Sequence, residues 1–156
     1  MAAPRPDTTL FLRRSFSAPR EKVFAAFTRP EALKEWWIPN DGFSVPAAEI
    51  DLRPGGGYRV AMKNPRGEVF YLSGTYREIE PPERLVYTWR WESSEMDIGE
   101  TLVTVEFHDQ RGSTELRIAH ELFPDTAMRD RHQQGWSGCL DRLTGILFVN
   151  PISPTG

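Results

Sequence analysis

The hydrophobic pattern of this chain changes its period, and this change restricts most strongly the folds that the chain can adopt. Between about residues 43 and 120, apolar side chains recur at alternate positions, in segments separated by turn sequences such as RPGGG at 53–57. From Thr126 to about Val149 they recur every three or four residues instead. Alternation is typical of strands with one buried face, whereas the longer period is typical of an amphipathic helix. The sequence therefore predicts a run of antiparallel strands followed by one long helix.

One further strand and two short helices are predicted ahead of this run. The segment from Thr9 to Phe16 is expected to form a strand, and Ser17 to cap a helix with Pro19 in its first turn. Pro30 opens a second short helix. A long helix of this length spans about 36 Å, enough to lie across a whole sheet. Strands followed by a helix that covers one sheet face indicate an α+β fold.

Length and composition limit the class of protein. The 156 residues amount to about one domain, which we expect over residues 9–149, with a flexible lead at 1–8 and a flexible tail at 150–156. The net charge of −3 leaves no basic excess for binding nucleic acid. The single cysteine, Cys139, excludes an intramolecular disulfide and fits a cytoplasmic location, where we expect it to be buried and unreactive. No apolar run is long enough for a membrane span.

No motif in the chain predicts a metal, nucleotide or covalent cofactor. His108, His120 and His132 are scattered, without the spacing of metal ligands. The glycines at 55–57 lack the following helix and lysine of a phosphate-binding loop. The sequence GWSG at 135–138 lies within the predicted helix and lacks the spacing of a nucleophile elbow. We therefore expect neither a cofactor nor a metal site.

Aromatic side chains predict where the interior lies. The alternating residues of the strand at 85–91 should face Trp136 and its neighbours on the long helix. Such stripes usually fill a core, and a ligand cavity is the alternative. Gly135 and Gly138 each cost the helix about 1 kcal/mol relative to alanine, so they should provide either space for a ligand or close backbone approach. The residues expected to line a cavity are Trp36, Trp37, Phe70, Tyr87, Trp89, Trp91, His120, Trp136, Cys139, Leu140 and Leu143.

Two histidines are candidates for polar chemistry in this interior. His120 shares the parity of the inward-facing Ile118, and His132 precedes Trp136 by one helical turn. Either could bind a polar ligand group or act as a general base, with Glu49 as a carboxylate near the cavity mouth. The alternative is that both are hydrogen-bonded structural residues.

Several motifs, in this order and spacing, resemble a known family. They are FSAPREKVF at 16–24, TRPE at 28–31, WWIP at 36–39, RPGG at 53–56, GTYREIEPPERLVYTW at 74–89 and HQQGW at 132–136. The chain resembles the helix-grip superfamily of START and birch-pollen-allergen-like domains. More narrowly, it is similar to the branch named after the activator of a heat-shock chaperone's ATPase. The resemblance implies a curved antiparallel sheet of six or seven strands around the C-terminal helix, with a cavity between them.

The resemblance implies several functions, because members of the superfamily include lipid carriers, hormone receptors, cyclases and co-chaperones. The first is binding of a small hydrophobic molecule in the cavity. The second is a co-chaperone that binds a heat-shock chaperone, although the chain shows only the helix-grip domain, which argues against stimulation of the ATPase. The third is a cyclase or hydrolase that uses a cavity histidine. Both a monomer and a homodimer fit the sequence.

Overall fold

The structure is a computed structural model that describes residues 8–93 and 97–149. Its elements follow the predicted order of a strand, two short helices, six strands and a long helix. They are β1 (Leu10–Phe16), α1 (Arg20–Thr28), α2 (Pro30–Trp36), β2 (Ser44–Ile50), β3 (Gly57–Lys63), β4 (Val69–Glu80), β5 (Arg84–Trp91), β6 (Thr101–Gln110), β7 (Ser113–Glu121) and α3 (Thr126–Val149). The predicted tail at 150–156, and the predicted lead except Thr8, lie outside the described residues.

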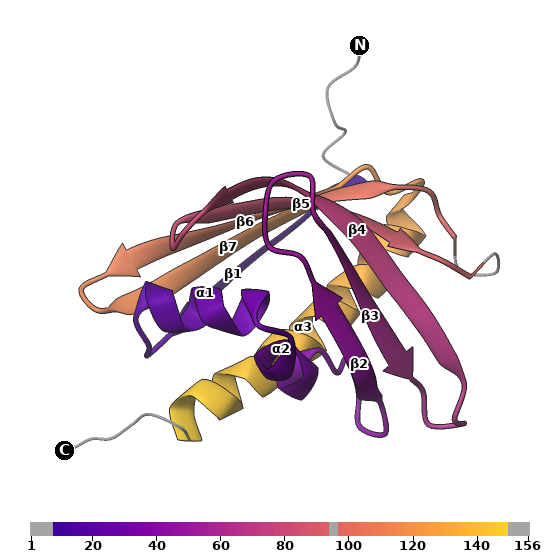
Figure 1. Ribbon diagram of the computed structural model, residues 1–156, viewed down its shortest axis with the longest axis horizontal. Coiled ribbons are helices and arrows are strands. Elements are labelled where there is room, and N and C mark those ends of the chain that lie inside the picture. Colours follow the sequence, from indigo (N-terminus) through magenta and orange to yellow (C-terminus); the bar gives the residue numbers. More distant parts are fainter. Residues whose placement is uncertain (1–7, 94–96, 150–156) are drawn as a thin grey trace, which may run out of the picture.

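The seven strands form one sheet in the order β1-β7-β6-β5-β4-β3-β2. Every neighbouring pair is antiparallel. Strands β2 to β7 pair with the strands that are next to them in the chain. The first strand, β1, pairs with the last, β7, with Leu10 opposite His120. The sheet curves, and α3 crosses its concave side (Figure 1). The predicted α+β helix-grip fold is confirmed.

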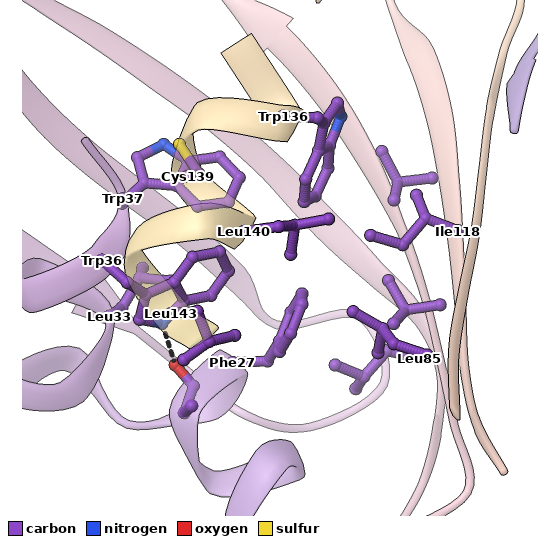
Figure 2. Close-up of a cluster of buried hydrophobic side chains, with 14 of the residues drawn as sticks. Phe27, Leu33, Trp36, Trp37, Leu85, Ile118, Trp136, Cys139, Leu140 and Leu143 are labelled. Carbon is purple, nitrogen blue, oxygen red and sulfur yellow. Dashed lines mark hydrogen bonds between the residues drawn. The ribbon is translucent and has the colours of Figure 1, made fainter. Parts of the chain in front are cut away.

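The core lies between α3 and the concave face of the sheet. The buried residues of α3 follow the predicted helical spacing, and Figure 2 shows Trp136 and Leu140 pointing toward the sheet. These residues are Trp136, Cys139, Leu140, Leu143 and Leu147. On the sheet side, Leu85 and Ile118 are buried opposite them. Within the described ranges, no helix is long and apolar enough to cross a membrane.

Helices α1 and α2 contribute large side chains to this core. Phe27 of α1 packs its ring against Trp36 of α2 and Phe107 of β6, with centroid distances of 4.7 and 5.5 Å. The indole Nε1 of Trp36 donates a hydrogen bond to the carbonyl of Ala26 at 2.8 Å (Figure 2). Leu143 of α3 is buried in the same cluster. These side chains therefore fill most of the interior next to the C-terminal half of α3, where the space bordered by Phe27 and Leu33 measures only about 20 Å³.

The start of α1 differs from the prediction. Pro19, not Ser17, is the N-cap residue, and no side chain caps the helix. The carbonyl of Pro19 accepts hydrogen bonds from the backbone N–H groups of Lys22 and Val23 at 3.0 and 3.2 Å. Proline at this position has an extended ψ of 157° and lacks an N–H of its own, so the helix begins directly after it.

Candidate functional site

A cavity of about 420 Å³ lies between the N-terminal half of α3 and the sheet. This volume is within the range of small-molecule sites in proteins. Met62, Ile98 and Met128 contribute to its apolar wall. The aromatic part of the wall consists of Trp37, Phe43, Phe70, Trp89, Trp91 and Trp136.

Three tryptophans from different elements meet at the inner wall of the cavity. Trp37 follows α2, Trp89 belongs to β5 and Trp136 to α3. Their ring centroids are 5.1 Å apart for Trp37 and Trp136, and 5.4 Å apart for the two pairs that include Trp89. These distances are typical of packed aromatic pairs. The wall is therefore held by ring contacts among a loop, a strand and a helix.

The two glycines of α3 have different roles. A Cβ atom at Gly138 would collide with the backbone carbonyl of Pro39, so this glycine allows the loop after α2 to approach the helix. A Cβ atom at Gly135 would lie 3.9 Å from the Cβ of Pro39, in ordinary contact, and Gly135 lines the cavity. Close backbone approach explains the first glycine, and the second leaves space at the cavity wall.

His120 lies buried behind the cavity wall with both ring nitrogens engaged. The indole Nε1 of Trp136 donates to Nδ1 at 3.1 Å. Since Nδ1 accepts, the proton of the neutral ring is on Nε2, which contacts Oγ1 of Thr101 at 2.7 Å. Thr101 in turn donates to the carbonyl of Trp89 at 3.1 Å. Burial lowers the pKa of His120 well below its usual value, and nearby His132 lowers it further.

His132 lines the cavity, and its ring nitrogens are also engaged. The indole Nε1 of Trp91 donates to Nε2 at 2.9 Å. The remaining nitrogen, Nδ1, then carries the proton and donates to the carbonyl of Met128 at 2.8 Å. Burial lowers the pKa of His132, as does the charge of Arg131, while the Met128 carbonyl opposes this shift. Accepting a proton at Nε2 would break the bond from Trp91, so neither interior histidine presents a free base.

The fold and motifs agree with comparisons to known proteins. The family model described as "Activator of Hsp90 ATPase homolog 1-like protein" matches residues 17–147. The chain belongs to this family. The resemblance inferred from the sequence motifs is thereby confirmed.

Several solved structures of bacterial proteins are similar in fold to this Hsp90-activator-like chain. A protein of Chromobacterium violaceum is 32% identical, with a TM-score of 0.82, covering 93% of this chain and 99% of its own. A protein described as AHSA1 from Silicibacter pomeroyi is 28% identical, with a TM-score of 0.81 and coverage of 92% and 99%. One from Rhodobacter sphaeroides is 27% identical, with a TM-score of 0.81 and coverage of 96% and 99%. The comparison with curated proteins found no match.

The cavity of this Hsp90-activator-like protein contains six of the eleven predicted lining residues, namely Trp37, Phe70, Trp89, Trp91, Trp136 and Cys139. The other five are buried beside it, where Tyr87 borders a second space of only about 20 Å³. They are Trp36, Tyr87, His120, Leu140 and Leu143. Tyr87, for example, packs against the tyrosine rings of Tyr58 and Tyr76 at 5.4 and 5.9 Å. A side chain that faces the interior therefore does not necessarily line the cavity.

Glu49 does not line the cavity, contrary to the expectation that it lies at the mouth. It is exposed on β2, where it pairs with Arg59 of β3. Side chains alternate across a strand, and the partly buried neighbours Ala48 and Ile50 take the inward positions. Glu49 is therefore not placed to act with either interior histidine.

Sequence reasoning missed the polar residues of the cavity mouth, Asn40, Arg131 and Gln134. All three are exposed, so they resemble ordinary solvated residues in a sequence. One signal was present, because Arg131 precedes the cavity-lining Gly135 by four residues on the same helix. The apolar Met62 could also have been found, since it shares the strand parity of Val60.

Cys139 lines the cavity as a protonated thiol. Burial raises its pKa to about 12, although the charge of Arg142, three residues further along α3, acts in the opposite direction. A thiol with so high a pKa is a weak nucleophile at neutral pH, as the sequence predicted. Among residues 8–93 and 97–149, no group of three or more His, Cys, Asp and Glu side chains is arranged to hold a metal ion.

Proposed function

We propose that this protein binds a small hydrophobic molecule in the cavity between the sheet and α3. The observation that carries the proposal is an aromatic-lined space of about 420 Å³, compared with about 20 Å³ for the neighbouring space bordered by Phe27 and Tyr87. Transfer of apolar ligand surface from water into such a site contributes about 25 cal/mol for each Å² buried. An apolar cavity large enough for a metabolite is thus better explained by an occupant than by packing.

The composition of the wall favours a ligand with a flat or ring-containing body. The indoles of Trp37, Trp89 and Trp136 contact one another, which gives a stiff inner wall. Met62 and Met128 are flexible thioethers that adapt to ligands of different shape. An aromatic metabolite, a polyketide or a short lipid fits this combination.

The state of the two histidines supports binding rather than acid–base catalysis. Each histidine accepts a hydrogen bond from an indole and uses its other nitrogen for a second partner. A general base needs a free nitrogen within reach of the substrate proton. His132 therefore contributes a neutral polar surface to the cavity, and His120 supports Trp136 from behind.

Titration with phenylnaphthylamine, a neutral fluorophore that brightens in apolar sites, tests this proposal. We expect saturable binding of one molecule per chain. The Gly135→Leu variant should bind at least tenfold more weakly, because leucine would fill the cavity at this position. Gly145→Leu is the matched control, since a Cβ atom at Gly145 meets nothing within 4 Å.

Both variants replace one glycine of α3 by the same helix-favouring residue, so a difference between them reports the cavity. The absence of saturable binding, or equal affinity of both variants, would contradict the proposal. Native mass spectrometry of gently purified protein then addresses the natural ligand. A small-molecule adduct present on the wild type and absent from Gly135→Leu would give its mass.

Membership of the Hsp90-activator-like family favours a second candidate, a co-chaperone that binds a chaperone ATPase. This function would use the protein surface rather than the cavity. It predicts co-precipitation with an Hsp90-type chaperone and a change in its ATPase rate on addition of the protein. An unchanged rate together with no co-precipitation would exclude it.

A further inference from the structure

Arg131 carries a charge at the cavity that no described residue neutralises. It lines the cavity and is exposed. It has no hydrogen-bond or ion-pair partner within residues 8–93 and 97–149. Other arginines of α3 do have such partners, since Arg129 pairs with Asp130 at 2.8 Å and Arg142 with Asp41 at 2.9 Å.

The sequence of α3 explains why Arg131 has no ion-pair partner on its own helix. Side chains pair along a helix at spacings of three or four residues. The residues at these spacings from Arg131 are Ala127, Met128, Gln134 and Gly135, and none of them is a carboxylate. The adjacent carboxylate, that of Asp130, is engaged by Arg129 instead.

The remainder of the cavity lining is electrically neutral or apolar. No aspartate or glutamate occurs among the lining residues that the structure describes. His132 is held in its neutral form by the two hydrogen bonds described above. The side-chain amides of Asn40 and Gln134 add neutral donors at the mouth. Among the described lining residues, the formal charge is therefore that of Arg131 alone.

Resting on the proposed function, we propose that the cavity selects small hydrophobic molecules that carry an anionic group, such as a carboxylate. The apolar body of the ligand lies against the tryptophans, and its anionic group pairs with the guanidinium of Arg131 at the mouth. A guanidinium offers a planar pair of donors that matches a carboxylate or sulfonate. Placing the charge at the mouth keeps it partly hydrated, which avoids the cost of burying an ion in the apolar interior.

Two fluorophores that differ only in charge test this selection. Anilinonaphthalene sulfonate is phenylnaphthylamine with one added sulfonate, so their apolar bodies are the same. We expect Arg131→Gln to raise the Kd of the sulfonate probe about fivefold, the effect of losing one partly exposed ion pair. The Kd of the neutral probe should stay the same. Added salt should weaken only the binding of the sulfonate to the wild type.

Arg111→Gln is the matched control for the loss of one positive charge. Arg111 is in the turn between β6 and β7, at the opposite end of β7 from the start of α3. The Arg111→Gln substitution should leave the dissociation constants of both probes unchanged. Equal affinity of the wild type and Arg131→Gln for the sulfonate would overturn the inference about the anionic group. Saturable binding of the neutral probe in the same experiment would still support the proposed function. Failure of both probes to bind the wild type would overturn both.

Discussion

The two halves of the space between the sheet and α3 are built from the same kinds of side chain but differ in packing. Beside the C-terminal half of α3, Phe27, Trp36 and Leu143 belong to a buried cluster in which the space bordered by Phe27 is only about 20 Å³. Beside the N-terminal half, Trp91 and Trp136 border a cavity of about 420 Å³. Helices α1 and α2 account for the difference, because they supply side chains to the first half. A helix-grip sheet and its long helix do not fill their interior without such additional elements.

The two halves also differ in the acceptors of their indole hydrogen bonds. In the filled half, Trp36 donates to the backbone carbonyl of Ala26. In the half with the cavity, Trp91 and Trp136 donate to histidine ring nitrogens. A backbone carbonyl does not titrate, whereas a histidine that accepts a hydrogen bond must remain unprotonated there. The half with the cavity is therefore expected to be sensitive to pH.

Removal of an indole from the filled half should have the largest effect. Trp36→Ala would leave a large void and an unpaired carbonyl at Ala26, at a cost of about 3–5 kcal/mol in the free energy of unfolding. Phe70→Ala, at the partly buried wall of the cavity, should cost less than half as much. Urea denaturation measures both free energies.

The effects of these two substitutions on probe binding should have the opposite order to their effects on stability. The folded fraction of Trp36→Ala should bind phenylnaphthylamine as the wild type does, whereas Phe70→Ala should change its Kd. Equal losses of stability in the two variants would mean that the two halves are packed alike.

The second prediction concerns the pH dependence of stability. Both His120 and His132 have lowered pKa values in the folded protein, while in the unfolded chain they titrate near 6.5. Below this pH the unfolded state binds more protons, so the free energy of unfolding falls as the pH falls. The loss should reach about 2–3 kcal/mol between pH 6.5 and about pH 5. Carboxylates with lowered pKa values, such as Glu92 and Glu115, lose their contribution only below this window.

Variants that each replace one histidine test whether this loss of stability at low pH comes from the half with the cavity. His132→Gln keeps an acceptor for Trp91 but takes up no proton, so the pH dependence should be about half as steep. His108→Gln is the control, because the side chain of His108 is 42% exposed on the sheet. The same steep dependence in His132→Gln as in the wild type would show that His132 does not contribute. Urea denaturation at a series of pH values makes the comparison.

The sequence was sufficient for the fold because periodicity reports which face of an element is buried. The alternation around Leu85 and Trp89, and the helical spacing of Trp136 and Leu140, correctly predicted the two faces that meet. The start of α1 was predicted less well, since Ser17 has the preferred chemistry of a cap but Pro19 takes that position. The backbone restriction of proline, and not the capping preference of serine, determined where this helix begins.

The cavity could be predicted only in part, because parity distinguishes inward from outward but not empty from filled. Tyr87 and Trp89 lie on the same face of β5, yet Trp89 lines the cavity and Tyr87 packs against Tyr58. Their environments depend on how far α1 and α2 reach along the sheet, which is a tertiary property. Arg131 was missed because an unpaired arginine looks the same in a sequence as a solvated one.

The smallest expected effects come from the two glycines of α3, which separate close packing from open space on one helix. Gly138→Ala would drive a methyl group into the carbonyl of Pro39 and should cost about 1–3 kcal/mol. Gly135→Ala would place its methyl in ordinary contact with Pro39 and should gain up to about 1 kcal/mol from helix propensity. Urea denaturation of the two variants gives opposite signs if the cavity begins between these positions. Destabilisation of Gly135→Ala by the same amount as Gly138→Ala would mean that α3 is equally close to its neighbours at both glycines, and that the cavity does not extend to Gly135.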